Sequence, residues 1–349
     1  MRARTVLTAV VAVTLAAGLA ACQTASPKAA PKSEGPLSKV RIGVGGINKV
    51  IYMPAKLTEQ LGYFTAEGLD VELSDEQNGV NQENEMLAGH LDGVVGFMDH
   101  AYTLQVKGKC VESIVQFANT PLEKVMLATS QADKVKSMAD LRGKTIGFTS
   151  KGSSTNALIN SLMAKAGVKE SEFTGVGAGA GSTFIGSIEN GGIAAGITTP
   201  PTSTLLLKKG TAKTLVDLST VEATKAALGG LYPASSLYMP CEWVTAHPRE
   251  SQKLANAFVK TLRYLASNSA EDIAAKMPAD YAGGDAQVYV NSIKETKDGF
   301  TTDGVIDADG AKNVVDVLAA SIEDVAKNKA SINVTKAYTT EFVNKVPKA

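Results

Sequence analysis

Two short polar segments of the sequence carry side chains suited to holding a small molecule. The first is Gly152-Ser153-Ser154-Thr155, which comes directly before a stretch with helical spacing of apolar residues. Hydroxyl groups and free backbone N–H groups would gather at such a helix N-terminus and would suit a carboxylate, a sulfonate or a similar acceptor group. Ser153 or Ser154 could also serve simply as the helix cap, and the two roles are compatible.

The second segment is Met98-Asp99-His100-Ala101-Tyr102. Asp99 and His100 could hydrogen-bond a polar ligand, and Tyr102 or the preceding Phe97 could stack on a flat one. The alternative is that Asp99 only caps the helix that follows. A carboxylate in the site would favour a ligand with donor groups over a simple anion such as nitrate.

Loops that follow predicted strands supply the remaining candidates, because ligands of open α/β sheets bind beyond the carboxyl ends of the strands. Together with the two segments above, the predicted ligand-binding residues are Asn48, Tyr52, Met98, Asp99, His100, Asn119, Ser153, Ser154, Thr155 and Thr199.

Other kinds of chemistry find little support in the sequence. His90, His100 and His247 are far apart and match no metal-ligand spacing, and no serine sits in a G-x-S-x-G elbow. The glycine-rich run at 177–182 does not fit the dinucleotide-binding spacing and is interpreted as a turn before a helix. We therefore expect no metal, no cofactor and no enzymatic activity.

The N-terminal residues indicate export. Arg2 and Arg4 precede a short apolar run at 6–17, which is the pattern of a secretory signal peptide at 1–21. Leu19-Ala20-Ala21-Cys22 resembles a bacterial lipobox, which implies a diacylglycerol on the Cys22 thiol; the alternative is an ordinary signal peptide with a chance cysteine. The stretch 22–38 is rich in Ala, Pro, Lys and Ser and is expected to be a disordered tether, so the protein would be anchored to the membrane rather than span it.

Charge and cysteine content narrow the classes further. The chain has 35 basic and 35 acidic side chains, and removing the two arginines of the signal leaves 33 basic residues against 35 acidic ones. This balance argues against nucleic-acid binding, which requires a basic surface. Cys110 and Cys241 could pair in an oxidising exported compartment, or they could remain two separate buried thiols.

The periodicity predicts two successive α/β units and then a helical C-terminal part. Strands are expected at 40–44, 69–73, 93–97, 111–117, 125–129, 144–148, 173–176, 193–197 and 213–216, with a long extended stretch at 236–245. Helices are expected at 51–61, 81–88, 101–106, 153–166, 182–189, 201–208, 248–268, 271–275, 286–297 and 311–328.

Five segments, in order along the chain, resemble the SsuA-like binding proteins of nitrate, sulfonate and taurine importers, which are related to the thiamine-pyrimidine synthases. They are the opening strand at Lys39–Gly43, the GYFTAEGLDVE run at 62–72, LAGHLD at 87–92, MADLRGKTIG at 138–147, and His247-Pro248 with the following helix. Together they extend from about residue 39 to about residue 268. The sequence departs from the family pattern at Ala194, where an acidic residue is usual, and this weakens any transfer of ligand chemistry.

The resemblance implies a type II periplasmic-binding-protein clamshell, in which two α/β lobes are joined by two crossover strands and followed by a helical C-terminal tail. It implies lobe 1 at 39–124 and 245–349, lobe 2 at 125–244, and crossovers near 125–130 and 238–244. The return strand would lie antiparallel beside the strand that begins at about Val111, which would bring Cys110 and Cys241 within reach of each other.

The implied function is that of an exported, lipid-anchored solute-binding protein of an ABC importer. It would bind a small organic molecule by hinge closure, act as a monomer, and deliver the molecule to a permease with its ATPase. A thiamine-pyrimidine synthase-like enzyme or a ligand-sensing accessory protein is the alternative.

Overall fold

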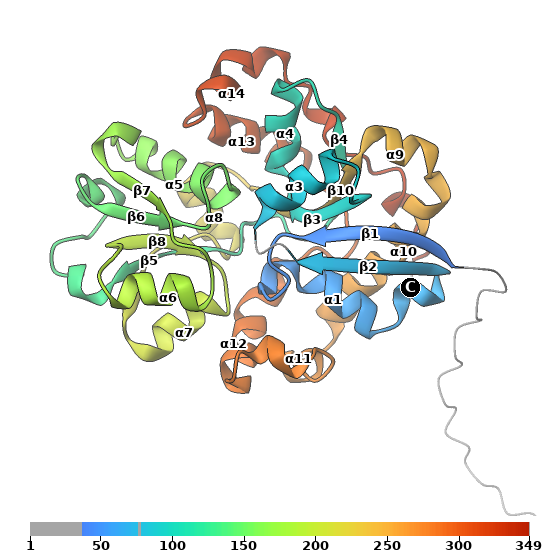
Figure 1. The fold of residues 1–349 in the computed structure, drawn as a ribbon, viewed down its shortest axis with the longest axis horizontal. Coiled ribbons are helices and arrows are strands. Elements are labelled where there is room, and N and C mark those ends of the chain that lie inside the picture. Colours follow the sequence, from blue (N-terminus) through green and yellow to red (C-terminus); the bar gives the residue numbers. More distant parts are fainter. Residues whose placement is uncertain (1–36, 76–77, 349) are drawn as a thin grey trace, which may run out of the picture. The chain divides into compact units, whose positions relative to one another are not determined.

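The first of two sheets is built mainly from the N-terminal part of the chain (Figure 1). The computed structural model describes residues 37–348 except 76 and 77, and these belong to one compact unit, Lys32–Ala349. Strand order in this sheet is β2-β1-β3-β10-β4, with β1 parallel to β2 and β3, and β10 antiparallel to β3 and β4. The strands are β1 (Ser38–Val44), β2 (Leu69–Asp75), β3 (Gly93–Phe97), β4 (Val111–Gln116) and β10 (Ser235–Pro240).

The second sheet repeats this arrangement with order β7-β6-β8-β5-β9. Strand β6 is parallel to β7 and β8, and β5 is antiparallel to β8 and β9. In each sheet the antiparallel strand is the one that the chain forms on arriving from the other lobe. The strands are β5 (Lys124–Ala128), β6 (Thr145–Phe148), β7 (Thr174–Gly177), β8 (Ala195–Thr198) and β9 (Ala212–Asp217).

Fourteen α-helices occur among the described residues. They are α1 (Met53–Gln60), α2 (Tyr63–Ala66), α3 (Gly79–Leu87), α4 (Asp99–Val106), α5 (Ser154–Lys165), α6 (Ser182–Glu189), α7 (Thr202–Lys209), α8 (Val221–Leu228), α9 (Cys241–Ala246), α10 (Pro248–Ser267), α11 (Ala270–Ala274), α12 (Ala286–Thr296), α13 (Ala308–Ala319) and α14 (Glu323–Asn328). The described residues include no helix with the length and apolar character that crossing a bilayer requires.

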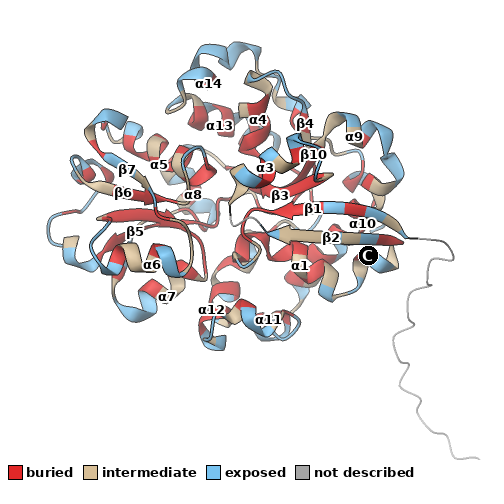
Figure 2. Ribbon diagram, in the orientation of Figure 1, coloured by how far each residue is buried: buried red, intermediate tan, exposed pale blue. Residues whose placement is uncertain are grey.

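Burial follows the pattern that mixed α/β layers require. All five residues of β3 and of β5 are buried, and the buried colour of Figure 2 runs along the central strands and the inner helix faces. Helix α10 shows how periodicity produces this packing, because Leu254, Phe258 and Leu262 recur every fourth residue and are fully buried. Phe258 contacts the rings of Phe64 and Phe117, with centroids 5.3 and 4.9 Å away.

The return to the first lobe differs from the expectation. The stretch 236–245 was expected to be extended and to hold a crossover at 238–244, but β10 lies wholly in the first sheet and α9 follows it at once. Pro240 ends the strand because it has no N–H for the ladder, and the helix begins at the next residue. The two crossing segments are therefore 117–123 and 229–234, and the predicted lobe 2 at 125–244 includes a strand and a helix that adjoin the first sheet.

The C-terminal helices contact both lobes rather than the first alone. Helix α12 packs on α7, and α13 packs on α5. Helices α5 and α7 both belong to the second lobe. Glu295 of α12 pairs with Lys124 at the start of β5, and the Ser161 hydroxyl of α5 donates to the carbonyl of Val317 in α13 at 2.7 Å. The C-terminal part therefore connects the two lobes and is not simply an extension of lobe 1.

Cys110 and Cys241 form a disulfide, with their Cα atoms 5.5 Å apart. The bond joins the residue before β4 to the first residue of α9, and the Cys241 N–H also donates to the Cys110 carbonyl at 3.1 Å. The pairing that the cysteine pattern left open is thus present in the structure. Cys22, the signal peptide and most of the tether lie outside the described residues.

Candidate functional site

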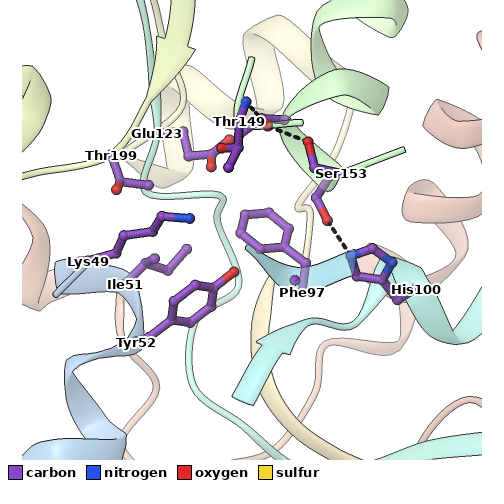
Figure 3. A pocket seen from close by; sticks show the side chains of 12 residues that line it. Lys49, Ile51, Tyr52, Phe97, His100, Glu123, Thr149, Ser153 and Thr199 are labelled. Atoms are coloured by element: carbon purple, nitrogen blue, oxygen red, sulfur yellow. Dashed lines mark hydrogen bonds between the residues drawn. The ribbon is translucent and has the colours of Figure 1, made fainter. Parts of the chain in front are cut away.

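A small cavity lies where the two lobes meet, and we call it the inner cavity (Figure 3). Loops after β1, β3, β6 and β8 contribute to it, as expected for a site beyond the carboxyl ends of strands. Its lining residues are Lys49, Ile51, Tyr52, Gly79, Phe97, His100, Glu123, Thr149, Ser153, Ser154, Thr155 and Thr199.

The turn after β1 supplies Lys49 and Tyr52. The Lys49 ammonium donates to the Gly45 carbonyl at 2.9 Å and lies 5.8 Å from the centre of the Tyr52 ring, an arrangement that favours a cation. Burial lowers the pKa of Lys49, while the negative charges of Glu123 and Asp75 act against that lowering. The same turn is fixed to the second lobe, since the Val50 N–H donates to the Pro200 carbonyl at 3.1 Å.

Two aromatic rings form an apolar wall. Tyr52 and Phe97 meet edge to face with their centroids 6.4 Å apart, and both line the cavity. Burial, followed by the charges of Glu123 and Asp99, raises the pKa of Tyr52 well above its ordinary range. The phenol therefore stays protonated and can donate a hydrogen bond to a ligand.

The hydroxyl groups at the N-terminus of α5 form hydrogen bonds with the neighbouring backbone and with each other. Ser153 caps the helix by accepting from the Asn156 N–H, and it also donates to the Ser150 carbonyl at 2.6 Å. Thr155 accepts from the Thr149 N–H at 3.0 Å, and its hydroxyl lies 2.7 Å from that of Ser153. The capping residues also line the cavity, so capping of the helix leaves this segment in position to contact a ligand.

Asp99 is engaged by protein groups rather than turned into the cavity. Its two carboxylate oxygens accept from the Ser154 hydroxyl at 2.7 Å and from the Tyr232 hydroxyl at 2.9 Å. These donors come from the second lobe and from the second crossing segment. Asp99 therefore fastens three parts of the chain together, and we call these residues, with His100 and Glu83, the Asp99 network.

His100 completes that network from the adjacent position. Its Nδ1 lies 2.7 Å from Glu83 Oε2, and its Nε2 lies 3.3 Å from the Ser154 oxygen. Because the single Ser154 hydroxyl proton is donated to Asp99, Nε2 must donate to that oxygen, so the geometry favours the doubly protonated imidazolium. Burial lowers the pKa of His100, but the hydrogen bond to Glu83 and the charges of Asp99 and Glu83 outweigh this and leave the pKa raised.

Glu123 is the acid that faces the inner cavity. It lies at the end of the first crossing segment, directly before β5, and is 2% exposed. Its Oε2 is buried and has no hydrogen-bond partner among the described residues. Burial raises the pKa of Glu123 to about 8, the Lys49 charge opposes the rise and the Asp99 charge adds to it.

A wider outer chamber adjoins the inner cavity through Lys49 and Thr149, which line both. Asn48 and the glycine-rich residues at 179–183 line this chamber. The glycine-rich turn thus reaches the region between the lobes, although it is not a dinucleotide loop.

The predicted residues divide into three groups. Tyr52, His100, Ser153, Ser154, Thr155 and Thr199 line the inner cavity, and Asn48 lines the outer chamber. Met98, Asp99 and Asn119 do not line either space: Met98 is fully buried, Asp99 serves the network, and the Asn119 backbone carbonyl accepts from the Tyr232 N–H.

Sequence reasoning did not single out Lys49, Ile51, Gly79, Glu123 and Thr149. Lys49 and Ile51 fall within a loop that the strand pattern had marked, so a search for charge in that loop would have found Lys49. Glu123 had no such signal, because an acid before a strand usually faces solvent. No cluster of His, Cys, Asp and Glu within the described ranges could hold a metal ion.

Comparisons with known proteins agree with the fold. A protein of Bordetella bronchiseptica RB50 with a solved structure is 34% identical, with a TM-score of 0.83, over 88% of this chain and 96% of that one. The alkanesulfonate-binding protein SsuA from Xanthomonas axonopodis pv. citri, bound to MOPS, is 17% identical over 87% and 99% of the two chains, with a TM-score of 0.67. The periplasmic nitrate-binding protein NrtA from Synechocystis PCC 6803 is 12% identical over 88% of each chain, also with a TM-score of 0.67.

The last two similarities establish the periplasmic-binding-protein fold, and a search of curated proteins gave no match in sequence. The family model described as NMT1/THI5 like matches residues 52–271, which is more than half of the chain and includes strands of both sheets. The chain belongs to the NMT1/THI5-like family.

Proposed function

We propose that this protein is the extracytoplasmic solute-binding lipoprotein of an ABC importer. It captures a small organic solute, such as a sulfonate, a carboxylate or a heterocycle, and delivers it to a permease that works with an ATPase. The observation that carries the proposal is the inner cavity, which lies between two α/β lobes and is lined by residues of both.

Structural relatives support the class of function. The neighbours from Xanthomonas and Synechocystis are named for binding an alkanesulfonate and nitrate, and one from Staphylococcus aureus is described as the ligand-binding component of an ABC-type import system. These proteins share the fold at low identity, so they support solute binding and leave the solute open.

Closure of the two lobes is the mechanism that the contacts favour. The bonds Ser154–Asp99 and Val50–Pro200 join the lobes beside the cavity and can form only when the lobes meet. A ligand that contacts both sides binds the closed form better than the open one and shifts the population toward it. The closed surface is then the signal that a permease reads.

Export and anchoring rest on the N-terminal sequence, with a signal at 1–21 and a lipid on Cys22. The variant Cys22→Ser should move the protein from the membrane fraction to the soluble exported fraction. Mass spectrometry of the protein that retains Cys22 should detect the diacylglycerol. A Cys22→Ser protein that stays in the membrane fraction would contradict lipid anchoring. The protein is expected to act as a monomer, which sedimentation of the detergent-solubilised form can check.

A thermal-shift screen tests solute binding itself. The library should hold nitrate, taurine, alkanesulfonates, aromatic acids and nitrogen heterocycles. A solute at 100 times its Kd adds about 2.7 kcal/mol to the free energy of unfolding, which is a clear shift. If no library member stabilises the protein, import of these solute classes is contradicted, and a sensing protein or a ligand of another class becomes the better account.

An enzyme of the thiamine-pyrimidine synthase type is the competing function. Mass spectrometry of a bound solute after long incubation separates the two, because a binding protein returns it unchanged and an enzyme returns a product.

A further inference from the structure

Glu123, at the end of the first crossing segment, and Lys49, in the turn after β1, line the same small space. Figure 3 shows the Lys49 ammonium and the Glu123 carboxyl turned toward the region beside the Phe97 ring, with the Tyr52 hydroxyl below them. The described residues form no direct ion pair between them, since the Lys49 ammonium is bonded to the Gly45 carbonyl instead. Each of these two groups therefore retains hydrogen-bonding capacity toward the cavity.

The unsatisfied Glu123 oxygen requires a hydrogen-bond donor on the ligand. A buried carboxyl oxygen without a hydrogen bond costs free energy that a ligand donor would recover. A carboxylate can only accept hydrogen bonds, and a carboxylic acid still accepts through its carbonyl oxygen, so a ligand N–H or O–H satisfies Glu123 in either form.

Lys49, the second charged group that faces the cavity, requires a hydrogen-bond acceptor on the ligand. Lys49 has three donor hydrogens and no acceptor, so it suits a carbonyl or carboxylate oxygen. His100, the remaining basic residue of the lining, already engages Glu83 and Ser154. The lining contains no arginine, the residue best suited to clamp a planar anion through two bonds.

We propose that the inner cavity selects a small solute of zero net charge, which presents a hydrogen-bond donor to Glu123 and, next to it, an acceptor to Lys49. This rests on the proposed function and defines the chemistry of its solute. Two kinds of molecule meet the description: a flat amide-bearing ring, and a zwitterion with an ammonium and a carboxylate. The Tyr52 and Phe97 rings give either kind an apolar wall.

Simple anions such as nitrate and alkanesulfonates do not fit this pair. They offer Lys49 an acceptor but have no donor for the Glu123 oxygen, and once Glu123 ionises they also bring a second negative group against it. Binding of such an anion would require Glu123 to stay protonated, so its affinity would decrease as Glu123 ionises.

Matched pairs of small probes test the proposal on protein purified from membranes in detergent. Nicotinamide and nicotinate share one ring and differ in charge, and β-alanine and propionate share one chain length and differ in the ammonium. Titration calorimetry at pH 9, above the pKa of about 8 to which burial raises Glu123, should give at least tenfold tighter binding for nicotinamide than for nicotinate, or for β-alanine than for propionate. Which neutral member binds identifies the amide or the zwitterion as the source of the chemistry.

Charge variants of the pair make the test specific. At the same pH, Glu123→Gln removes the negative charge with little change in shape and should lower the preference for the neutral member at least tenfold, because the site then carries the Lys49 charge alone. Lys49→Met should weaken both members of a pair. Glu112→Gln is the matched control: Glu112 lies on β4, does not line the cavity, and should leave the preference unchanged.

The outcomes separate this inference from the broader function. Preferential binding of the anionic members, an unchanged preference in Glu123→Gln, or failure of both neutral probes to bind would overturn it. If the anions bind, solute capture stands and only the selectivity is wrong. If the thermal-shift library also gives no binder, the proposed function fails with it.

Discussion

The Ser154 hydroxyl at the N-terminus of α5 donates to the carboxylate of Asp99 at the N-terminus of α4, 2.7 Å away and across the boundary between the two lobes. Both residues are almost fully buried. A hydrogen bond to a charged group contributes about 1.5–3 kcal/mol, so this bond can bias the equilibrium between open and closed lobes.

Ser154→Ala should therefore weaken solute binding about tenfold or more, because it removes the bond from the closed form and not from the open one. Titration calorimetry with any solute found in the screen measures the loss. Ser187→Ala is a suitable control, since the Ser187 hydroxyl is exposed and bonds only within α6. Equal affinities in Ser154→Ala and the unmodified protein would show that the bond does not contribute to closure.

Raising the pH should loosen the Asp99 network through His100. The pKa of His100 is raised above 6.5 in the folded protein, so its contribution to stability is complete below about 6.5 and is lost as the pH rises through the raised pKa. The groups that face it are Glu83 on α3, Asp99 beside it and Lys107 at the end of α4. His100→Gln should remove this part of the decline in Tm; an unchanged decline would assign it to other groups.

Glu123 should contribute a second decline in stability over a defined range. Burial raises its pKa from 4.5 to about 8, so the folded protein holds a proton that the unfolded chain releases, and stability falls as the pH rises between these values. Glu123→Gln cannot ionise and should gain Tm relative to the unmodified protein from pH 5 to pH 9. A constant difference in Tm across that range would mean that Glu123 does not titrate as its burial requires.

Asp99 and Glu123 show what the sequence could and could not predict. Strand and helix periodicity placed most elements within a few residues, and the two serines at the start of α5 indicated a helix cap that lines the site. Asp99 was expected to meet the ligand, but its partners Ser154 and Tyr232 lie 55 and 133 residues away in sequence and no local pattern reveals them. Glu123 was missed for the same reason, because its burial depends on how the crossing segment meets the turn after β1.

Predictions of element boundaries were wrong where a single residue determines where a strand or helix ends. The stretch 236–245 was expected to be extended throughout, but Pro240 ends the strand. Helix α8 was not predicted, although Thr220 caps it by accepting from the Ala223 N–H and Gly229 ends it with a positive φ of 87°. These cap signals are local, so this helix could have been found from the sequence.

The disulfide should contribute a large part of the stability of the folded protein. Cys110 and Cys241 are 131 residues apart in sequence, and closing so long a loop restricts the unfolded chain strongly. Its removal should cost about 2–5 kcal/mol in the free energy of unfolding. The bond also ties α9 to the residue before β4, so its loss should loosen the return strand β10 first.

Urea denaturation with and without a reducing agent measures this cost. The double variant Cys110→Ser, Cys241→Ser should unfold at lower urea concentration than the oxidised protein and should be insensitive to the reductant, while the unmodified protein should approach it on reduction. Hydrogen exchange should then increase at Ser235–Pro240 more than in β5, which lies in the other sheet. Uniform loss of protection in both sheets would mean that the bond stabilises the chain through its unfolded state alone and does not hold the return strand locally.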